Sequence, residues 1–145
     1  MDKGLAVLIM AVVGGFIALQ APINAGLGKA TGSFAAALVS FAVGTLVLAA
    51  IVILSGRAGG VGEATGVEWY YLLGGILGAA YVFSALVLVD EIGAGGVAAA
   101  TVTGQLVTSV ALDRIGVLGL EQTSITWERL LGVALLLGGT YLVVR

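Results

Sequence analysis

The sequence predicts an all-α membrane protein with five transmembrane helices. Of its 145 residues, 60% are hydrophobic and only 10% are charged. Soluble domains carry about 25% charged residues, so this chain has too little polar surface to fold in water. The charges also divide the chain into five uncharged apolar runs. Closed β-barrels are the other structures that span membranes, but their strands alternate apolar and polar residues, and these runs do not.

The five runs give the five predicted helices. A helix needs roughly 20 residues to cross a hydrocarbon core of about 30 Å. The first four runs are long enough, and the fifth becomes long enough when Thr126 and Trp127 are placed in the membrane interface. They form one transmembrane domain over residues 1–145, with helices over residues 4–27, 33–55, 69–89, 92–112 and 127–144.

The first helix is expected to stay in the protein. A signal peptide is also apolar, but this run is long, contains Gln20, Pro22 and Asn24, and is followed by four more spans. The second helix ends near Ser55, and the five glycines of the stretch Ser55–Gly66 predict a flexible loop outside the membrane.

Aromatic and acidic residues delimit the last three helices. Trp69–Tyr71 and Trp127 lie where aromatic side chains favour the membrane interface. Asp90 and Glu91 separate the third and fourth helices with almost no loop, which predicts a tight hairpin at these two residues. Their carboxylates are expected near the positive N-terminal end of the fourth helix.

The basic residues predict a cytoplasmic N-terminus by a small margin, because four lie on one side of the five helices and two on the other. The small margin leaves insertion in both orientations open. The sequence contains no visible repeat, so a ten-helix inverted-repeat carrier would require an antiparallel, dual-topology homodimer. The larger group contains Lys3, Arg57, Arg114 and Arg129, and the smaller contains Lys29 and Arg145.

Small residues predict where helices pack closely. Gly74 and Gly78 form a small-xxx-small pair in the third helix, and Gly14 forms another with Ala18 in the first. Such pairs let helix backbones approach each other in membranes. These glycines are expected to pack helices within one chain or at a dimer contact.

The composition excludes several classes of function. The chain has no cysteine, so it has no disulfide and no thiolate metal site, and it has no histidine, the usual general base. Its net charge is −2, and its six basic residues are spread along the chain and form no basic patch for nucleic acid. No enzyme activity, metal, cofactor or nucleic-acid partner is therefore expected.

Polar residues inside the apolar runs are the most informative. Gln20 and Asn24 lie four residues apart on one face of the first helix, and Pro22 between them removes a backbone hydrogen bond, which predicts a kink. An amide left unsatisfied in hydrocarbon is costly, so both should face protein, water or a ligand. They either hold helices together or contact a substrate.

A polar stripe follows the fourth helix, where Thr101, Gln105 and Ser109 recur at intervals of four. Threonine and serine hydroxyls can bond to their own helix, whereas Gln105 cannot do so easily and is the better candidate for a substrate contact. Such a stripe is expected to line an interior surface, not to face lipid.

Three more polar side chains interrupt the second and third helices. Tyr81 lies near the middle of its helix, where it either covers a polar cluster or lines a pocket. Ser40 and Thr45 are expected to bond back to the backbone of their own helix.

Several groups of residues in combination are typical of one family. They are Gln20–Gly28, Ser40–Gly44, Trp69 with Leu73–Ala79, Tyr81–Val82, Gly104–Gln105 with Asp113–Gly116, and Arg129–Gly132. Through these groups the chain resembles the YdcZ-like branch of the drug/metabolite transporter superfamily from its first helix to its last. The resemblance implies a five-helix half-transporter that acts as an antiparallel pair or in fused form. It implies transport but names no substrate.

The small multidrug resistance proteins offer a related comparison. Their first helix carries a membrane-embedded glutamate that exchanges protons for cations, whereas this first helix carries Gln20 and Asn24, which do not titrate. The acids Asp90, Glu91 and Asp113 lie at helix ends. Asp113 would couple transport to protons only if it lay deeper in the membrane.

The sequence therefore predicts a multi-pass carrier of the inner membrane that opens a binding site alternately to each side. Its partners would be the lipid bilayer, a small-molecule substrate and a second copy of the chain. A proton-coupled exporter, a channel and a non-transporting scaffold subunit are the alternatives. A small neutral, zwitterionic or weakly anionic solute is expected to contact Gln20, Asn24, Tyr81, Thr101, Gln105 and Ser109.

Overall fold

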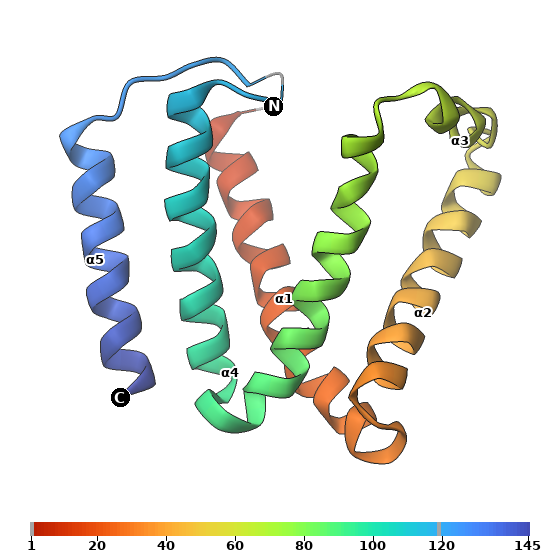
Figure 1. Ribbon diagram of the computed structural model, residues 1–145, viewed down its shortest axis with the longest axis horizontal. Coiled ribbons are helices and arrows are strands. Elements are labelled where there is room, and N and C mark those ends of the chain that lie inside the picture. The colour runs from red at the N-terminus through yellow and green to blue at the C-terminus, as the bar shows by residue number, and fades with distance from the viewer. Residues whose placement is uncertain (1, 119) are drawn as a thin grey trace. The chain divides into compact units, whose positions relative to one another are not determined.

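The structure is a computed structural model that describes residues 2–118 and 120–145 (Figure 1). Over these residues every regular element is a helix and none is a strand, which confirms the all-α prediction. Four helices are long and apolar enough to cross a membrane. They are α1 (Lys3–Thr31), α2 (Ser33–Leu54), α4 (Leu73–Ile115) and α5 (Trp127–Val144).

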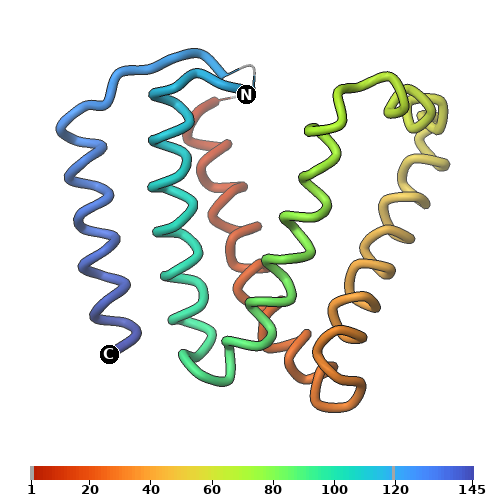
Figure 2. The backbone as a smooth tube through the Cα atoms, in the orientation of Figure 1, coloured from red at the N-terminus to blue at the C-terminus, as the bar shows by residue number. Residues whose placement is uncertain are grey.

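The 43-residue helix α4 contains two membrane-length segments. Gly93 breaks it with φ 72° and ψ 165°, a backbone conformation that is essentially restricted to glycine. The break separates a first segment, residues 73–92, from a second segment, residues 94–115, and each has the length of about 20 residues that crosses a bilayer. Figure 2 shows the backbone turning here.

The position of this break corrects the sequence-based expectation of a hairpin at Asp90 and Glu91. Both residues are helical, and the first segment of α4 continues through them to Ile92. The acids mark the end of the apolar run, but charge alone does not stop a helix. The backbone turns where a glycine follows, because only glycine adopts a positive φ with an extended ψ at no steric cost.

The glycine-rich stretch after α2 forms two short elements, α3 (Gly59–Glu63) and η1 (Ala64–Gly66). The aromatic group that follows forms a 3₁₀ turn, η2 (Trp69–Leu72), so α4 begins at Leu73 instead of at residue 69. The rings of Tyr70 and Tyr71 lie 4.6 Å apart within this turn.

A single residue joins α1 to α2. Gly32 has φ 84° and ψ 151°, which turns the chain without a longer loop. Its N–H donates to the carbonyl of Gly28 at 2.8 Å, and its own carbonyl accepts from the N–H of Ala36 at 3.0 Å. Gly32 therefore satisfies one backbone carbonyl near the end of α1 and one backbone N–H in the first turn of α2.

The helices group into two compact units. One unit contains Met1–Leu19 and Leu88–Arg145, hereafter the two-part unit, and the other is the continuous stretch Gln20–Val87, hereafter the continuous unit. Both α1 and α4 therefore contribute to both units. The boundary within α1 lies two residues before Pro22, and α1 is helical through that proline.

Small side chains dominate the core of the continuous unit. Gly28 lies at a close contact, because a Cβ placed on it would be 3.6 Å from Leu86 Cδ1 and 3.8 Å from Ala36 Cβ. Phe34 and Phe83 stack beside this core with ring centroids 4.5 Å apart. The larger apolar side chains of the helices are mostly exposed, as expected for surfaces that face lipid. The buried residues of this unit are Ala21, Asn24, Ala25, Ala36, Val82, Ala85 and Leu86.

Three contacts tie the second segment of α4 to α5 in the two-part unit. In the middle, the hydroxyls of Thr103 and Thr140 lie 2.6 Å apart. At one end, a Cβ placed on Gly96 would be 3.4 Å from Val144 Cγ2, so the helices approach closely there. At the other end, Arg129 Nη1 donates to Asp113 Oδ2 at 3.0 Å.

Candidate functional site

A small cavity lies between α1 and α2 within the continuous unit. Its volume is about 190 Å³, enough for several water molecules or a small solute. Gln20 of α1 and five residues of α2 line this α1–α2 cavity, and none of them is charged. The residues of α2 are Ser40, Phe41, Gly44, Thr45 and Leu48.

The depth of the α1–α2 cavity follows from helix geometry. Gln20 precedes Gly32 by 12 residues and Gly44 follows it by 12. A rise of 1.5 Å per residue places both about 18 Å from the turn along their helices. Because the hydrocarbon core is about 30 Å thick, a turn at the membrane surface places the cavity close to the bilayer centre.

The polar groups of the α1–α2 cavity have no partner within the described part of the chain. The hydroxyls of Ser40 and Thr45 make no hydrogen bond there, and neither does the amide of Gln20. The expectation that Ser40 and Thr45 bond to their own helix is therefore wrong, because both side chains line the cavity instead. One amide and two hydroxyls supply donors and acceptors for a bound solute.

Phe41, the aromatic residue that lines the cavity, packs against Gly78. A Cβ placed on Gly78, in the first segment of α4, would be 3.4 Å from Phe41 Cζ and 3.7 Å from Cε1. The Phe41 ring therefore packs directly against the α4 backbone at this point. Gly78 acts as a packing glycine within the chain, and its contact sets the position of one cavity wall.

Asn24 lies one helical turn beyond Gln20 in the same unit. Its side chain is only 5% exposed, and its amide makes no hydrogen bond to another described residue. Among the described residues, no side-chain nitrogen or oxygen is both fully enclosed and without a hydrogen-bond partner. The unpaired amide of Asn24 is therefore part of the small surface that this side chain exposes to solvent. Asn24 is thus a buried polar group whose amide is still available to water or a solute.

Tyr81 also belongs to the continuous unit, in the first segment of α4. It is half-buried beside the buried residue Val82. Its hydroxyl makes no hydrogen bond within the described part of the chain, and Tyr81 is not among the residues that line the α1–α2 cavity. Of the residues expected to contact substrate, the structure therefore places Gln20 in the cavity and Asn24 and Tyr81 in the same unit.

The polar stripe of α4 belongs to the two-part unit. Thr101 is half-buried, and Gln105 and Ser109 are exposed. None of the three makes a side-chain hydrogen bond to a described residue. The threonine that faces α5 is Thr103, which is buried and lies two residues away from both Thr101 and Gln105. A substrate site that includes Gln105 remains a prediction.

Asp113 forms part of a folded connection, with its side chain 35% exposed. It pairs with Arg129, whose Nη1 also donates to Thr123 Oγ1 at 3.0 Å. The N–H of Thr123 in turn donates to the carbonyl of Asp113 at 2.8 Å. These contacts give Asp113 a structural role near the end of α4, and they argue against a free coupling acid.

The other small residues expected to pack helices lie in open surroundings. A Cβ on Gly14 or on Gly74 would meet no described atom of the chain within 4 Å, in contrast to Gly78. Pro22 is exposed on α1. Within the described part of the chain, no group of three or more acidic side chains could hold a metal ion.

Sequence reasoning missed the apolar and hydroxyl lining that α2 gives the cavity. Phe41 follows Ser40 directly and lies within a stretch already noted as typical of a family, so that stretch carried the available signal. Thr103 and Thr140 were also missed, because the pairing of a threonine on one helix with a threonine on another depends on how the two helices face each other.

One family of proteins matches almost the whole chain. The match covers residues 5–142, and the family's description is "Putative inner membrane exporter, YdcZ". No curated protein matches the chain, and no solved structure matches it.

Proposed function

Because the chain belongs to the YdcZ family of inner-membrane exporters, we propose that it exports a small solute by alternating access and binds it in the α1–α2 cavity. The family's description and the four apolar helices support a multi-pass transporter of the inner membrane.

The proposal rests on an uncharged cavity between two membrane helices, α1 and α2, whose polar lining groups make no hydrogen bond within the described part of the chain. Gln20, Ser40 and Thr45 have no partner in the described part of the chain, although polar groups at this depth are costly when they are left unsatisfied. A bound solute or water satisfies them. A scaffold subunit has no need of such groups, whereas a carrier uses them to bind its substrate.

The lining of the cavity also favours one class of substrate. It contains no carboxylate that could attract a cation and no basic group that could hold a strong anion. The Phe41 ring and Leu48 offer apolar surface beside the amide and the hydroxyls. The solute is therefore small and neutral, zwitterionic or weakly anionic, with an apolar part that packs on Phe41 and a polar part that meets Gln20 and Thr45.

The proposal includes an antiparallel homodimer. Five membrane segments are an odd number, and a second copy inserted in the opposite orientation would supply the inverted repeat on which many carriers depend. A Cβ placed on Gly14 or Gly74 would meet no described atom of a neighbouring element within 4 Å, which leaves these small-residue surfaces available for a second copy.

Two measurements test the proposal. The first is a thermal-shift screen of the purified protein against neutral, zwitterionic, anionic and cationic metabolites. A ligand at 100 times its Kd stabilises the folded state by about 2.7 kcal/mol, so ligands of the expected class should raise Tm. The second is exchange in proteoliposomes, where a labelled solute inside should leave faster when the unlabelled solute is present outside.

The outcomes separate the candidate functions. Saturable exchange of a neutral, zwitterionic or weakly anionic solute supports the carrier. Flux that does not saturate and is not accelerated by solute on the opposite side indicates a channel. A screen in which only lipophilic cations bind contradicts the proposed substrate class and favours an exporter of the small multidrug resistance kind.

A further inference from the structure

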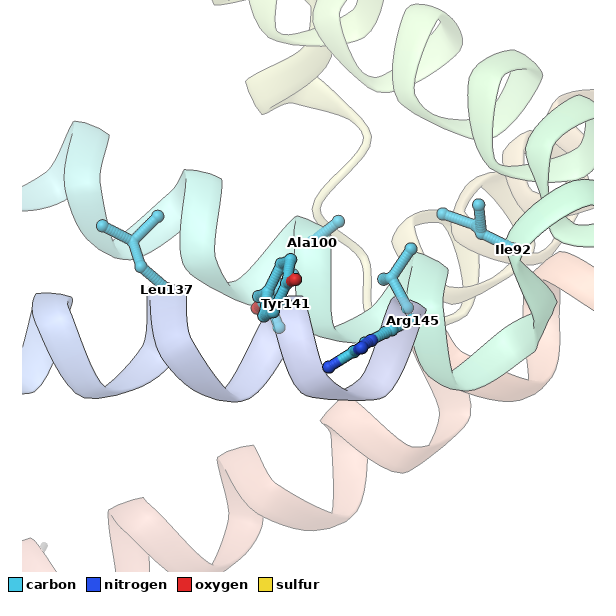
Figure 3. Close-up of a pocket in the computed structure, with 7 residues that line it drawn as sticks. Ile92, Ala100, Leu137, Tyr141 and Arg145 are labelled. Carbon is cyan, nitrogen blue, oxygen red and sulfur yellow. The ribbon is translucent and has the colours of Figure 1, made fainter.

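A second concave surface lies between α4 and α5 in the two-part unit, where α4 contributes Ile92 at the end of its first segment and Ala100 of its second. This α4–α5 groove has a volume of about 510 Å³ and is mostly apolar. Figure 3 shows that Ile92 and Ala100 reach it from α4 and that Leu137, Tyr141 and Arg145 reach it from α5. The remaining lining residues are Thr140 and Val144.

The α4–α5 groove exists because the two helices touch on both sides of a small residue. They approach closely at Gly96, where a Cβ would be 3.4 Å from Val144 Cγ2, and they are joined again at Thr103 and Thr140. Ala100 lies between these two contacts on α4. Its methyl group is too small to fill the space between the helices, so the apolar groove remains open over it.

The polar groups of the groove are concentrated near the end of α5. The Thr140 hydroxyl is used between the helices, since it lies 3.1 Å from the Ala99 carbonyl oxygen as well as 2.6 Å from Thr103 Oγ1. The Tyr141 hydroxyl and the Arg145 guanidinium make no hydrogen bond or ion pair with any described residue. Tyr141 is 65% exposed.

The cationic end of the groove lies at the depth of lipid headgroups. The 18 residues of α5 rise about 27 Å along the helix axis, which is close to the thickness of the hydrocarbon core. With Trp127 at one membrane interface, Arg145 therefore reaches the other. Tyr141 lies one turn before it, where aromatic side chains are enriched in membrane proteins.

We propose that the α4–α5 groove binds one anionic phospholipid. The phosphate accepts hydrogen bonds from the Arg145 guanidinium and the Tyr141 hydroxyl, and one acyl chain lies along Ile92, Ala100 and Leu137. An arginine beside an apolar channel complements a ligand with an anionic head and a hydrocarbon tail. A small neutral solute leaves the cation unpaired, so this groove is separate from the α1–α2 cavity in chemistry as well as in position on the chain.

The test compares phosphatidylglycerol with phosphatidylcholine of the same acyl chains. Lipids retained by the full-length protein in detergent are counted by native mass spectrometry. The wild-type protein should prefer phosphatidylglycerol by about fivefold, the contribution expected from one basic residue at a membrane surface. Arg145→Gln should abolish this preference. Arg57→Gln removes a charge from the loop after α2 and should leave the preference unchanged.

A second variant separates the groove from the charge alone. Ala100→Phe fills the α4–α5 groove and leaves Arg145 in place, so retention of both lipids should fall. A Tm close to that of the wild type shows that each variant is folded. Where Ala100→Phe does not fold, Ala100→Leu serves the same purpose with a smaller side chain.

Three results would overturn the proposal. One is an unchanged preference for phosphatidylglycerol in Arg145→Gln. Another is a rise in Tm with inorganic phosphate equal to the rise with phosphatidylglycerol, which shows that Arg145 and Tyr141 bind free phosphate and not a lipid. The third is efficient disulfide formation between two copies of Tyr141→Cys in the membrane, which shows that a second chain covers the groove.

Discussion

The hydroxyl oxygens of Thr103 and Thr140 lie 2.6 Å apart and join the second segment of α4 to α5. Each hydroxyl also lies near a backbone carbonyl of the facing helix, Thr103 at 3.4 Å from Leu136 and Thr140 at 3.1 Å from Ala99. With one proton and two lone pairs each, the two hydroxyls satisfy one another and one carbonyl. The Thr45 hydroxyl, in the α1–α2 cavity, has no such partner among the described residues.

The same substitution at these two kinds of site should therefore have different effects. Thr140→Val removes a hydrogen bond between helices and should lower the free energy of unfolding by about 0.5–1.5 kcal/mol. Thr45→Val loses no hydrogen bond within the chain and should leave stability nearly unchanged, while weakening solute binding. Unfolding by titration with a denaturing detergent measures both. Equal losses of stability would show that Thr45 has a structural partner after all.

Gln20→Leu and Gln105→Leu test the two halves of the expected substrate site separately. If Gln20 binds solute, Gln20→Leu should remain folded and lose about 1–3 kcal/mol of binding free energy, because the polar group of the solute loses its partner. If Gln105 belongs to the same site, Gln105→Leu should show the same pattern. Calorimetric binding of a solute from the screen gives the affinities. Normal binding by both variants would move the site toward Tyr81.

Gln20→Glu should make transport depend on pH. The wild-type α1–α2 cavity contains no titratable group, so its solute exchange should vary little between pH 5 and pH 8, a range set by ordinary side-chain titration. A carboxyl group at position 20 places a titratable charge in a cavity that otherwise has none. Exchange of a neutral or weakly anionic solute should then fall as the pH rises and the carboxylate forms. A flat profile for the variant would place residue 20 in contact with bulk water.

Gly78→Leu and Gly74→Leu are a matched pair on the first segment of α4. A Cβ at position 78 would already touch the Phe41 ring at 3.4 Å, so the longer leucine side chain should crowd the ring, and overpacking of this kind costs about 1–3 kcal/mol. A Cβ at position 74 would meet no described atom of a neighbouring element within 4 Å, so the fold should tolerate leucine there. Unfolding measurements together with the oligomeric state in detergent distinguish the two. Loss of the dimer in Gly74→Leu alone would assign Gly74 to the contact between copies.

The antiparallel homodimer predicts that each end of the chain is found on both sides of the membrane. The chain has no native cysteine, so one cysteine introduced near either end reports on sidedness without background. In intact cells, an impermeant thiol reagent should label part of each cysteine population, and permeabilising the cells should make the remaining cysteines accessible to the reagent. Labelling of one end only would require a parallel pair or a different partner chain.

The helical architecture was predictable from the sequence because the spacing of charges reflects the thickness of the membrane. The break in α4 was not placed correctly, although the correct residue was close by. Asp90 and Glu91 reveal where the apolar run stops, whereas the turn depends on the conformational freedom of Gly93, which composition and charge do not display.

The candidate site was predictable only in part. Gln20 stands out in the sequence because an amide in an apolar run needs an explanation. Its cavity partners on α2 are ordinary residues for a membrane helix, and they become a site only through the register of α2 against α1, which the turn at Gly32 fixes. In the same way Thr101 and Thr103 are the same residue type on one helix, but of these two only Thr103 has a described partner on α5.

The division of α1 between two units has a consequence for the order of assembly during synthesis. The stretch Gln20–Val87 is continuous, so it can reach its final packing while the ribosome is still adding the remaining residues. The stretch Met1–Leu19 belongs instead with Leu88–Arg145. The stretch Met1–Leu19 must therefore wait for α5 before its unit is complete.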